Sequence, residues 1–220
     1  PVRRAVRLMG SFSDASGVLF DLDGTLWDAT EAIRVSWAMA LESAPDVEAP
    51  PTREQLERVM GMTADNLMAT LFPKLSKERH RELFDACCKA EDVYLRQHGG
   101  ILFPGLEETL QTLSRELPLF IVSNCNKEYI PCFLDAHQLH RYFRDWECIG
   151  RTGKQKWENI RLVVERNHLQ RPVYVGDTTM DQEAAQKAGV PFLHAAYGFG
   201  EVTGAPEITQ FPQLLELLQD

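Results

Sequence analysis

The segment Val18-Leu-Phe-Asp21-Leu-Asp23-Gly24-Thr25-Leu26 places two carboxylates directly after a short apolar run. Residues 18–20 are continuously apolar and stop at a turn signal, which is typical of a buried parallel strand. Side chains alternate along an extended chain, so Asp21 and Asp23 are expected to leave the strand toward the same side. Open α/β sheets bind ligands at the carboxyl ends of their strands. The segment therefore predicts a site for a hard cation, which carboxylates readily ligate.

An Asp-x-Asp-Gly sequence also has a plainer interpretation. Asp21 would cap the next helix, and Asp23-Gly24 would form an ordinary turn. Polar segments at the ends of other strands would favour the cation site, because they would bring further ligands to the same edge of a sheet.

Length, composition and charge limit the function. The chain has 220 residues, 44% hydrophobic and 25% charged, an ordinary globular composition. This length suits one core with an inserted subdomain better than two full-sized domains. The formal net charge of −9 argues against nucleic acid as the main partner, because phosphate backbones attract basic faces. A phosphorylated small molecule remains compatible, since a metal ion and a few local cations can make a positive pocket.

Cysteine usage and hydropathy bear on the compartment. The five cysteines include no Cys-x-x-Cys pair, and no secretory signal is recognisable, so we expect reduced thiols and a cytoplasmic protein. No apolar run approaches the length of a membrane-spanning helix, so we expect no membrane partner. Residues before about Ser16, including the basic start and Met9, are expected to form a tail.

Residues from about 30 to 99 have a helical pattern throughout. An amphipathic helix is expected over 30–43, before the proline-rich segment 44–51. Thr52 and Gln55 have the spacing of a capping box for a short helix. Thr63 is expected to cap the next helix, and Ser76 a long one that ends near Gly99.

After Gly100 short apolar runs alternate with helical stretches. Strands are expected at 101–103, 119–122, 148–149, 173–175 and 192–193, and helices at 106–116, 127–136, 157–166 and 180–188. Such alternation predicts a parallel sheet with helices on both faces. We therefore predict an α/β fold with a Rossmann-like three-layer core, residues 16–29 and 100–220. An all-helical cap, residues 30–99, is inserted after the first strand.

Two further predicted strands end in polar segments. The hydroxyl, amide and free N–H groups of Ser123-Asn124 suit a phosphate oxygen, although Ser-Asn is also a common turn. The strand at 173–175 ends in Gly176-Asp177, and Asp181 follows one helical turn later. Asp177 and Asp181 are thus expected at the same rim as Asp21 and Asp23.

Two lysines, Lys154 and Lys156, precede a predicted helix. Either ammonium group would offset crowded negative charge at the rim. Judged alone, each is ordinarily a solvated surface charge.

Together these segments resemble the haloacid dehalogenase superfamily, in the phosphoglycolate phosphatase-like branch that has a helical cap after the first strand. Asp21-Leu-Asp23-Gly24-Thr25-Leu26 matches its first motif, Ser123-Asn124 its second, Lys156 its third and Gly176-Asp177-x-x-x-Asp181 its fourth. The resemblance extends from about Gly17 to Gly200, with the motifs in the expected order. Lys156 is preferred to Lys154 because Lys-x-Glu-Asn-Ile is the usual form of the third motif.

The resemblance implies an Mg²⁺-dependent phosphatase that acts on a small phosphorylated metabolite through an aspartyl-phosphate. Asp21 would be the nucleophile, and Asp23 would be the general acid and then the base. Mg²⁺ would be held by Asp21, Asp177 and the backbone carbonyl of Asp23. Asp181 would act through water or by holding the lysine.

The remaining motif residues would handle the phosphoryl group. The resemblance implies that Ser123 and the N–H of Asn124 bind its oxygens. Lys156 would stabilise both the nucleophile and the transferred group, since phosphoryl transfer depends mainly on positioning and charge.

The residues that each reaction requires distinguish phosphatase activity from the other reactions of this superfamily. Dehalogenation requires no acid for the leaving group, and Asp23 supplies one. Phosphonate cleavage needs a Schiff-base lysine, and no cap lysine lies in a segment that we recognise as that motif. Phosphosugar mutases share the same acids but usually carry a histidine where Ile33-Arg34 stands. A catalytically idle binding module is the remaining alternative.

The cap is expected to set the substrate. The part of the substrate beyond its phosphate group, if anionic, could contact any of five cap cations: Arg34, Arg53, Arg58, Lys74 and Arg96. Gly61-Met62-Thr63 is expected to be a specificity loop, or else an ordinary turn between two helices. Phosphoglycolate, sugar phosphates and nucleoside monophosphates all suit this architecture. We expect a monomer or a weak homodimer.

Overall fold

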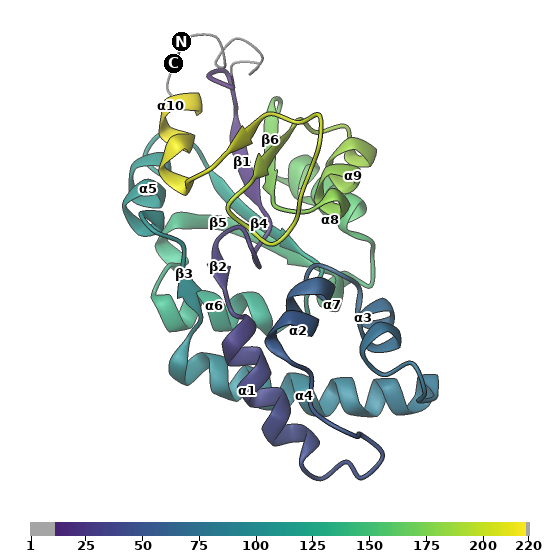
Figure 1. Ribbon diagram of the computed structural model, residues 1–220. Helices are drawn as coiled ribbons and strands as arrows, with labels where there is room; N and C mark the ends of the chain where they lie inside the picture. The colour runs from purple at the N-terminus through teal and green to yellow at the C-terminus, as the bar shows by residue number, and fades with distance from the viewer. Residues whose placement is uncertain (1–11, 219–220) are drawn as a thin grey trace.

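A six-stranded parallel sheet forms the centre of the molecule (Figure 1). The computed structural model describes residues 12–218, so most of the predicted N-terminal tail, including Met9, lies outside the described residues. In spatial order the strands are β5 (Phe143–Cys148), β4 (Leu119–Ser123), β1 (Gly17–Phe20), β6 (Pro172–Gly176), β7 (Phe192–Ala195) and β8 (Glu207–Ile208). β1, the strand expected from residues 18–20, lies between β4 and β6.

Helices cover both faces of this sheet. Alternating residues of β1 point to opposite sides: Leu19 packs with α8 (Lys156–Arg166) and α9 (Thr179–Ala188), whereas Val18 and Phe20 belong to the other core cluster. That second cluster includes α5 (Leu106–Leu113), α6 (Tyr129–His137) and α10 (Leu214–Leu218). The predicted three-layer α/β fold is thus confirmed.

The chain between the first strand and the rest of the core is helical. Its helices are α1 (Thr30–Leu41), α2 (Arg53–Val59), α3 (Ala64–Leu71) and α4 (Lys77–His98). Thr52 and Gln55 form the predicted capping box, and Ser76 caps α4. Thr63 is the N-cap residue of α3, as predicted, but its side chain makes no capping hydrogen bond. The division into a core and a separate cap domain at 30–99 stays a prediction.

The two connections between the sheet and the helical insertion pair with each other. β2 (Trp27–Asp28) and β3 (Ile101–Leu102) form a separate antiparallel pair. Residues 101–103 were expected to be a strand of the main sheet, and that placement was wrong. The run pairs with Trp27 and Asp28 instead, and Ile101 is 67% exposed. The pair ties the entry and the exit of the insertion together.

Other element boundaries differ from the predictions near the carboxyl end. β5 begins five residues before the predicted strand at 148–149, because Arg144, Asp145 and Glu147 disguise its apolar pattern. Ile149 instead opens the short helix α7 (Ile149–Thr152). The edge strand β8 and helix α10 were not predicted, since β8 has only two residues.

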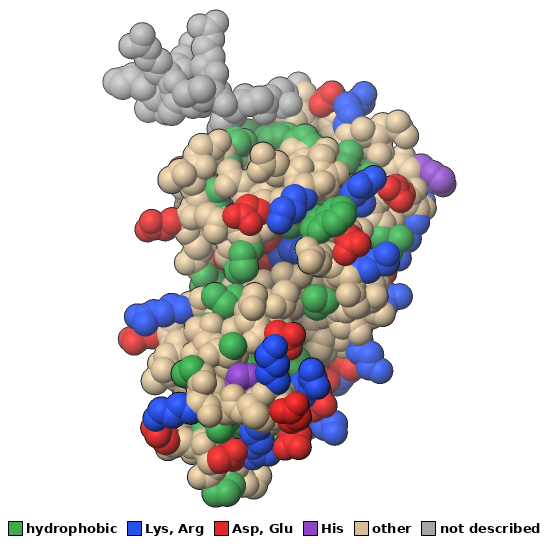
Figure 2. Space-filling view, turned by 90° about the vertical axis from the view of Figure 1, so that its right-hand side faces the viewer, with side chains coloured by type: hydrophobic (Ala, Val, Ile, Leu, Met, Phe, Trp, Pro, Cys, Tyr) green, Lys and Arg blue, Asp and Glu red, His purple; other side chains and the backbone are tan. Residues whose placement is uncertain are grey.

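The surface carries both signs of charge. Figure 2 shows acidic and basic side chains interspersed over the helical part of one face. None of the helices among residues 12–218 is long and apolar enough to span a bilayer. The five cysteines are all free thiols. The cytoplasmic location and the absence of a nucleic-acid partner stay predictions.

The turn after β1 packs directly on the end of β6. Gly24 has φ +75°, and a methyl group added there would lie 2.1 Å from Oδ2 of Asp177. One added to Gly198 would lie 2.3 Å from the Gly24 carbonyl oxygen. Glycine is required at both positions because two segments distant in sequence approach there without room for a side chain.

Gly24→Ala is therefore expected to destabilise the protein by more than about 2 kcal/mol, from strain at positive φ plus the clash with Asp177. Gly153 is the matched control: it has φ +66° and open space around it, so Gly153→Ala should cost only about 1 kcal/mol. Urea-induced unfolding of both variants measures the difference. Equal losses would show that the close approach at Gly24 contributes nothing.

Candidate active site

Three adjacent strands bring their carboxyl ends to one edge of the sheet. In the β1 register Phe20 lies opposite Ile121 of β4 and Val175 of β6. The residues that follow these strands therefore meet at the same level, and the Asp21 N–H donates to the Val175 carbonyl at 2.8 Å. This is where open α/β sheets place their ligands.

A buried lysine joins two of the predicted acids. Lys156, at the first turn of α8, is 4% exposed, and its Nζ lies 2.8 Å from Oδ1 of Asp21 and 2.5 Å from Oδ1 of Asp181. Lys154, the other candidate, is exposed. The structure thus brings Lys156 and not Lys154 into the acidic cluster, because the α8 capping box of Gln155 and Glu158 directs the chain inward at that residue.

Asp21, Asp177 and Asp181 could together hold a metal ion. Each offers an oxygen, and these atoms lie within 4.8 Å of one another. Oδ1 of Asp177 is buried and accepts no hydrogen bond from the described residues, and the buried Oδ1 of Asp21 is contacted by the Lys156 ammonium group. Buried acceptors are ordinarily paired, and an all-oxygen set suits a hard divalent cation.

The oxygens of Asp181 are already engaged. Oδ1 faces Lys156, while Oδ2 accepts from the backbone N–H of Thr178 at 3.0 Å and from its hydroxyl at 2.7 Å. Asp181 thus serves the N-terminus of α9 as well as the lysine.

Asp23 stands apart from this cluster, at the edge of a cavity. Its Oδ1 accepts two hydrogen bonds, from the Tyr129 hydroxyl at 2.8 Å and from the Trp27 indole N–H at 3.0 Å. These two donors fix the carboxyl group, and the half-buried side chain lines the cavity. The Asp23 carboxyl group is thus placed to transfer a proton to or from a ligand bound in the cavity.

Burial and mutual repulsion shift the pKa values of these groups. Burial raises the pKa of Asp21 to about 6, with Asp181 adding to the effect and Lys156 opposing it. Burial also raises the pKa of Asp23 to about 7, against the donors Tyr129 and Trp27. Burial acts to lower the pKa of Lys156, yet Asp181 and Asp21 raise it well above its usual value. The carboxylates therefore outnumber the positive charge available to them.

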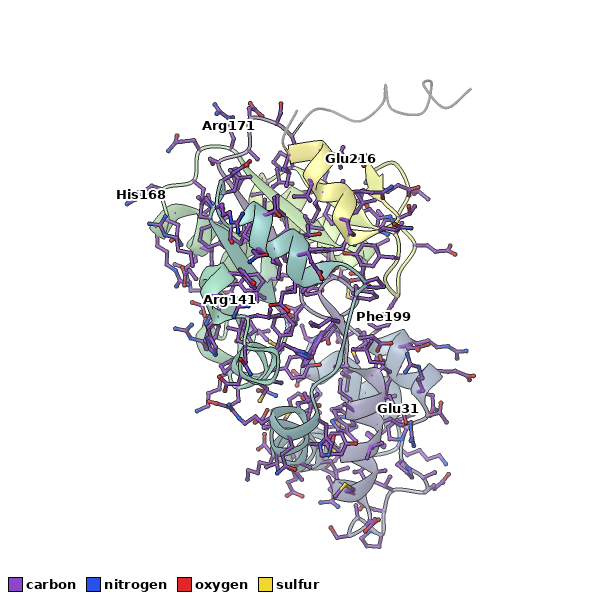
Figure 3. All side chains as sticks on the ribbon, turned by 90° about the vertical axis from the view of Figure 1, so that its left-hand side faces the viewer. Glu31, Arg141, His168, Arg171, Phe199 and Glu216 are labelled. Atoms are coloured by element: carbon purple, nitrogen blue, oxygen red, sulfur yellow. The ribbon has the colours of Figure 1, made fainter. Side chains whose placement is uncertain are left out.

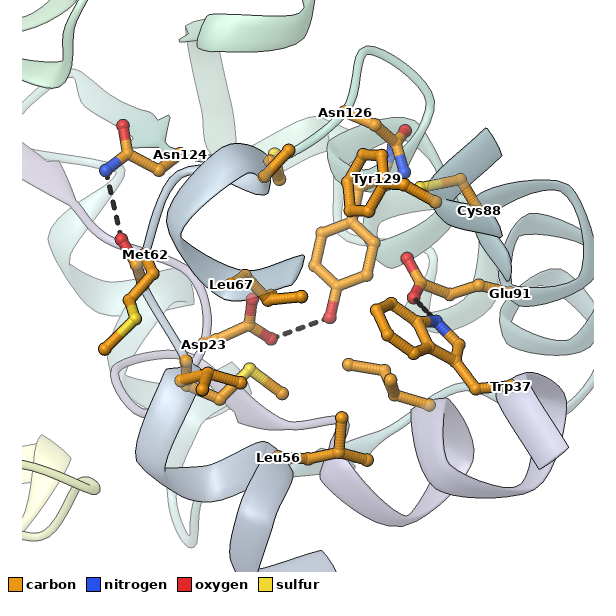
Figure 4. Close-up of a pocket in the computed structure, with 17 residues that line it drawn as sticks. Asp23, Trp37, Leu56, Met62, Leu67, Cys88, Glu91, Asn124, Asn126 and Tyr129 are labelled. Atoms are coloured by element: carbon orange, nitrogen blue, oxygen red, sulfur yellow. Dashed lines mark hydrogen bonds between the residues drawn. The ribbon is translucent and has the colours of Figure 1, made fainter. Parts of the chain in front are cut away.

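The predicted phosphate-binding residues lie beside these acids. Ser123 ends β4 and is 4% exposed. Asn124 reaches across to the helical insertion, where its Nδ2 donates to the Gly61 carbonyl at 3.0 Å. The loop between α2 and α3 is thus tied to the carboxyl edge of the sheet (Figure 4).

Several residues of the site were not predicted from the sequence. Tyr129 had no signal, because only the fold places α6 beside Asp23. The backbone N–H of Phe199 donates to Oδ2 of Asp177 at 2.8 Å, and Figure 3 shows Phe199 where the sheet core meets the helices. Thr178 did have a signal, since Thr178-x-x-Asp181 is a capping-box pattern. Trp27 lies in β2, and its indole N–H donates to Asp23.

Solved structures share this fold. A haloacid dehalogenase-like family hydrolase from Streptococcus pneumoniae superimposes with a TM-score of 0.78 at 22% identity, covering 92% of this chain and 97% of the other. CbbY from Rhodobacter sphaeroides, in complex with phosphate, superimposes with a TM-score of 0.79 at 19% identity, covering 94% and 100%.

Sequence comparison gives the family. Phosphoglycolate phosphatase from Escherichia coli (strain K12) is 31% identical over 221 residues, which cover 87% of this chain and 85% of that protein. The protein of the same name from Rhodobacter capsulatus is 31% identical over 195 residues, covering 84% and 86%. A family model described as haloacid dehalogenase-like hydrolase matches residues 18–195. The chain therefore belongs to the haloacid dehalogenase-like hydrolase family.

Proposed function

We propose that this protein is an Mg²⁺-dependent phosphatase that hydrolyses a small phosphomonoester through an aspartyl-phosphate on Asp21. The observation that carries the proposal is the buried contact of Asp21 with Lys156, next to a second carboxyl group, Asp23, that faces a cavity. The relatives named phosphoglycolate phosphatases support the reaction class.

The residues present fit a divalent cation. Asp21, Asp177 and the backbone carbonyl of Asp23 would hold Mg²⁺, since the carboxylates of Asp21 and Asp177 offer oxygens within 4.8 Å of each other and Oδ1 of Asp177 is buried without a donor among the described residues. When bound, the ion supplies positive charge that offsets the carboxylates and the phosphoryl oxygens. Asp181 would hold Lys156 in place, because its oxygens are committed to Lys156 and Thr178.

The protein's own residues then account for both half-reactions. A carboxylate oxygen of Asp21 attacks phosphorus as the ester P–O bond breaks, and the leaving alkoxide takes the proton of Asp23. Asp23, now ionised, removes a proton from a water molecule that attacks the phosphorus of the aspartyl-phosphate. Inorganic phosphate leaves, Asp21 is regenerated and Asp23 is protonated again. A pKa of about 7 for Asp23 suits both directions of proton transfer near neutral pH.

Ser123, Asn124 and Lys156 would bind the transferred group. Ser123 and the backbone N–H of Asn124 lie at the end of β4, beside the nucleophile's strand. The ammonium group of Lys156 neutralises charge on Asp21 and on the phosphoryl oxygens where water is largely excluded.

The phosphosugar mutase alternative has no observation in its favour. Mutases of this superfamily were expected to carry a histidine near Ile33, and no histidine lines the cavity into which Ile33 projects.

Replacing the buried lysine should abolish most activity. We expect Lys156→Met to lower kcat for phosphate release by at least about 100-fold, because Asp21 loses its neutralising charge. Lys154→Met should stay within about twofold of the wild type, since Lys154 is exposed. Both are measured with Mg²⁺ present, with circular dichroism to confirm folding. The reverse order would assign the catalytic lysine to position 154.

The nucleophile and the metal can be tested separately. Asp21→Asn is expected to lower kcat by at least about 1,000-fold, because the amide cannot form the covalent intermediate. Removal of Mg²⁺ with EDTA should stop phosphate release by the wild type, and added Mg²⁺ should restore it. Full activity in Asp21→Asn would exclude the covalent route, and full activity in EDTA would exclude the metal.

Tyr129 is expected to position the general acid. Tyr129→Phe removes the donor to Oδ1 of Asp23 and should lower kcat about 10- to 100-fold with a smaller change in KM. Tyr142→Phe is the matched control, since that hydroxyl interacts with Arg141 and Glu107 away from the site. Equal kinetics in the two variants would contradict the role given to Tyr129.

A further inference from the structure

A cavity lies between the carboxyl edge of the sheet and the helical insertion. It has a volume of about 70 Å³ and is lined by both parts of the chain. Asp23, Asn124 and Tyr129 come from the core side, and Figure 4 shows Glu91 and Trp37 facing the same space. A single water molecule needs roughly 10–15 Å³ of such a cavity. The cavity therefore has room for a ligand group of a few non-hydrogen atoms. Its other lining residues are Ile33, Leu56, Val59, Met60, Gly61, Met62, Ala64, Leu67, Phe84, Cys88, Cys125 and Asn126.

No cationic side chain lines this cavity. The two carboxyl groups that line it belong to Asp23 and Glu91, and most other lining side chains are apolar. Four of the five cap cations expected to meet an anionic substrate are paired with carboxylates elsewhere, and the fifth, Arg58, is exposed. The four pairs are Arg34 with Glu31, Arg53 with Asp28 and Glu57, Lys74 with Glu48, and Arg96 with Glu128 and Asp135.

Glu91 is the one buried carboxyl group of the insertion that reaches the cavity. It projects from α4 with 5% exposure, and its Oε2 accepts from the Trp37 indole N–H at 2.7 Å. Its Oε1 makes no hydrogen bond with the described residues and stays open to the cavity. Burial raises the pKa of Glu91 to about 8. A buried polar group with a free oxygen calls for a ligand that can hydrogen-bond to it.

We propose that this cavity holds the alcohol part of the phosphomonoester and selects a small uncharged alcohol with a second hydroxyl group opposite Glu91, rejecting hydroxy-carboxylates. The proposal rests on the phosphatase function above. The apolar walls accept the carbon chain, and Glu91 pairs with the hydroxyl. A carboxylate would lose its hydration in this cavity with no cationic side chain in the lining to pair with, which is strongly unfavourable.

Three phosphate esters of similar size test the selection. These are 2-hydroxyethyl phosphate, propyl phosphate and 2-phosphoglycolate, which end in a hydroxyl, a methyl and a carboxylate. We expect kcat/KM for 2-hydroxyethyl phosphate to exceed that for propyl phosphate, and to exceed that for 2-phosphoglycolate at least tenfold. A kcat/KM for 2-phosphoglycolate equal to or above that of the neutral esters would overturn the proposal.

Charge insertion at the cavity rim is the second test. Met62 lines the cavity from the half-exposed loop between α2 and α3, so Met62→Lys adds a cation there without burying it. The ratio of kcat/KM for 2-phosphoglycolate to that for 2-hydroxyethyl phosphate should rise at least tenfold. Met39→Lys is the matched control, because Met39 on α1 is 61% exposed and lies outside the cavity. An unchanged ratio in Met62→Lys would contradict the location of the leaving group.

Glu91→Leu tests the hydroxyl contact. The ratio of kcat/KM for 2-hydroxyethyl phosphate to that for propyl phosphate should fall to about one. This ratio does not depend on the fraction of enzyme that folds, because both substrates are measured on one preparation. An undiminished ratio would remove Glu91 from recognition.

The outcomes separate this inference from the proposed function. Phosphate release that favours 2-phosphoglycolate would leave the phosphatase standing and overturn the cavity assignment alone. No Mg²⁺-dependent phosphate release from these esters or from p-nitrophenyl phosphate would overturn both.

Discussion

The site depends on the repulsion between carboxylates that the fold forces together. Asp21, Asp177 and Asp181 are all at most 1% exposed, with oxygens within 4.8 Å of one another. Isolated charges in such a place are very unfavourable unless they are paired. Lys156 supplies one positive charge between Asp21 and Asp181, and a divalent cation is the natural second. The same shortage of positive charge that makes the site costly favours the binding of a divalent cation.

The surrounding structure serves to hold that arrangement. Parallel register aligns the ends of β1, β4 and β6, and glycines at positions 24 and 198 let the segments after β1 and β7 close on Asp177. The paired strands β2 and β3 then carry the chain out to the helices and back. Because the helical insertion is joined at this edge, its loops meet the site without taking part in the sheet. The cavity at this edge is therefore lined by both parts of the chain.

The core and the helical insertion contact each other around the cavity. Asn124 of the core bonds to Gly61 of the α2–α3 loop, and the cavity below is walled by both. Four of the five cap cations named above are committed to carboxylates outside the cavity, such as Arg34 to Glu31. The cavity itself has mostly apolar walls and no cationic side chain. In the proposal above, the substrate preference of this protein follows from the absence of a cationic side chain in the cavity as well as from the presence of Glu91.

Regular features of the core were predictable because they depend on local pattern. Continuous apolar runs marked β1, β4 and β6, and polar residues at their ends marked the rim. The apolar run at 101–103 was assigned to the wrong sheet, because it pairs with Trp27–Asp28 in the connection to the helices. β5 was underestimated because its charged residues, including the buried Glu147, break the apolar run. Thr63 had the residue type of a cap, but the loop geometry at α3 does not use its side chain.

The sequence by itself determined the fold class, the order of the motifs and the acids that gather at the sheet edge. Strand periodicity and turn chemistry are short-range properties, and they can be read from neighbouring residues. Only the tertiary structure decided that Tyr129 and Trp27 hold Asp23 and that Glu91 faces the cavity. These contacts join residues from separate elements, so they depend on how helices pack against the sheet, which no local pattern records.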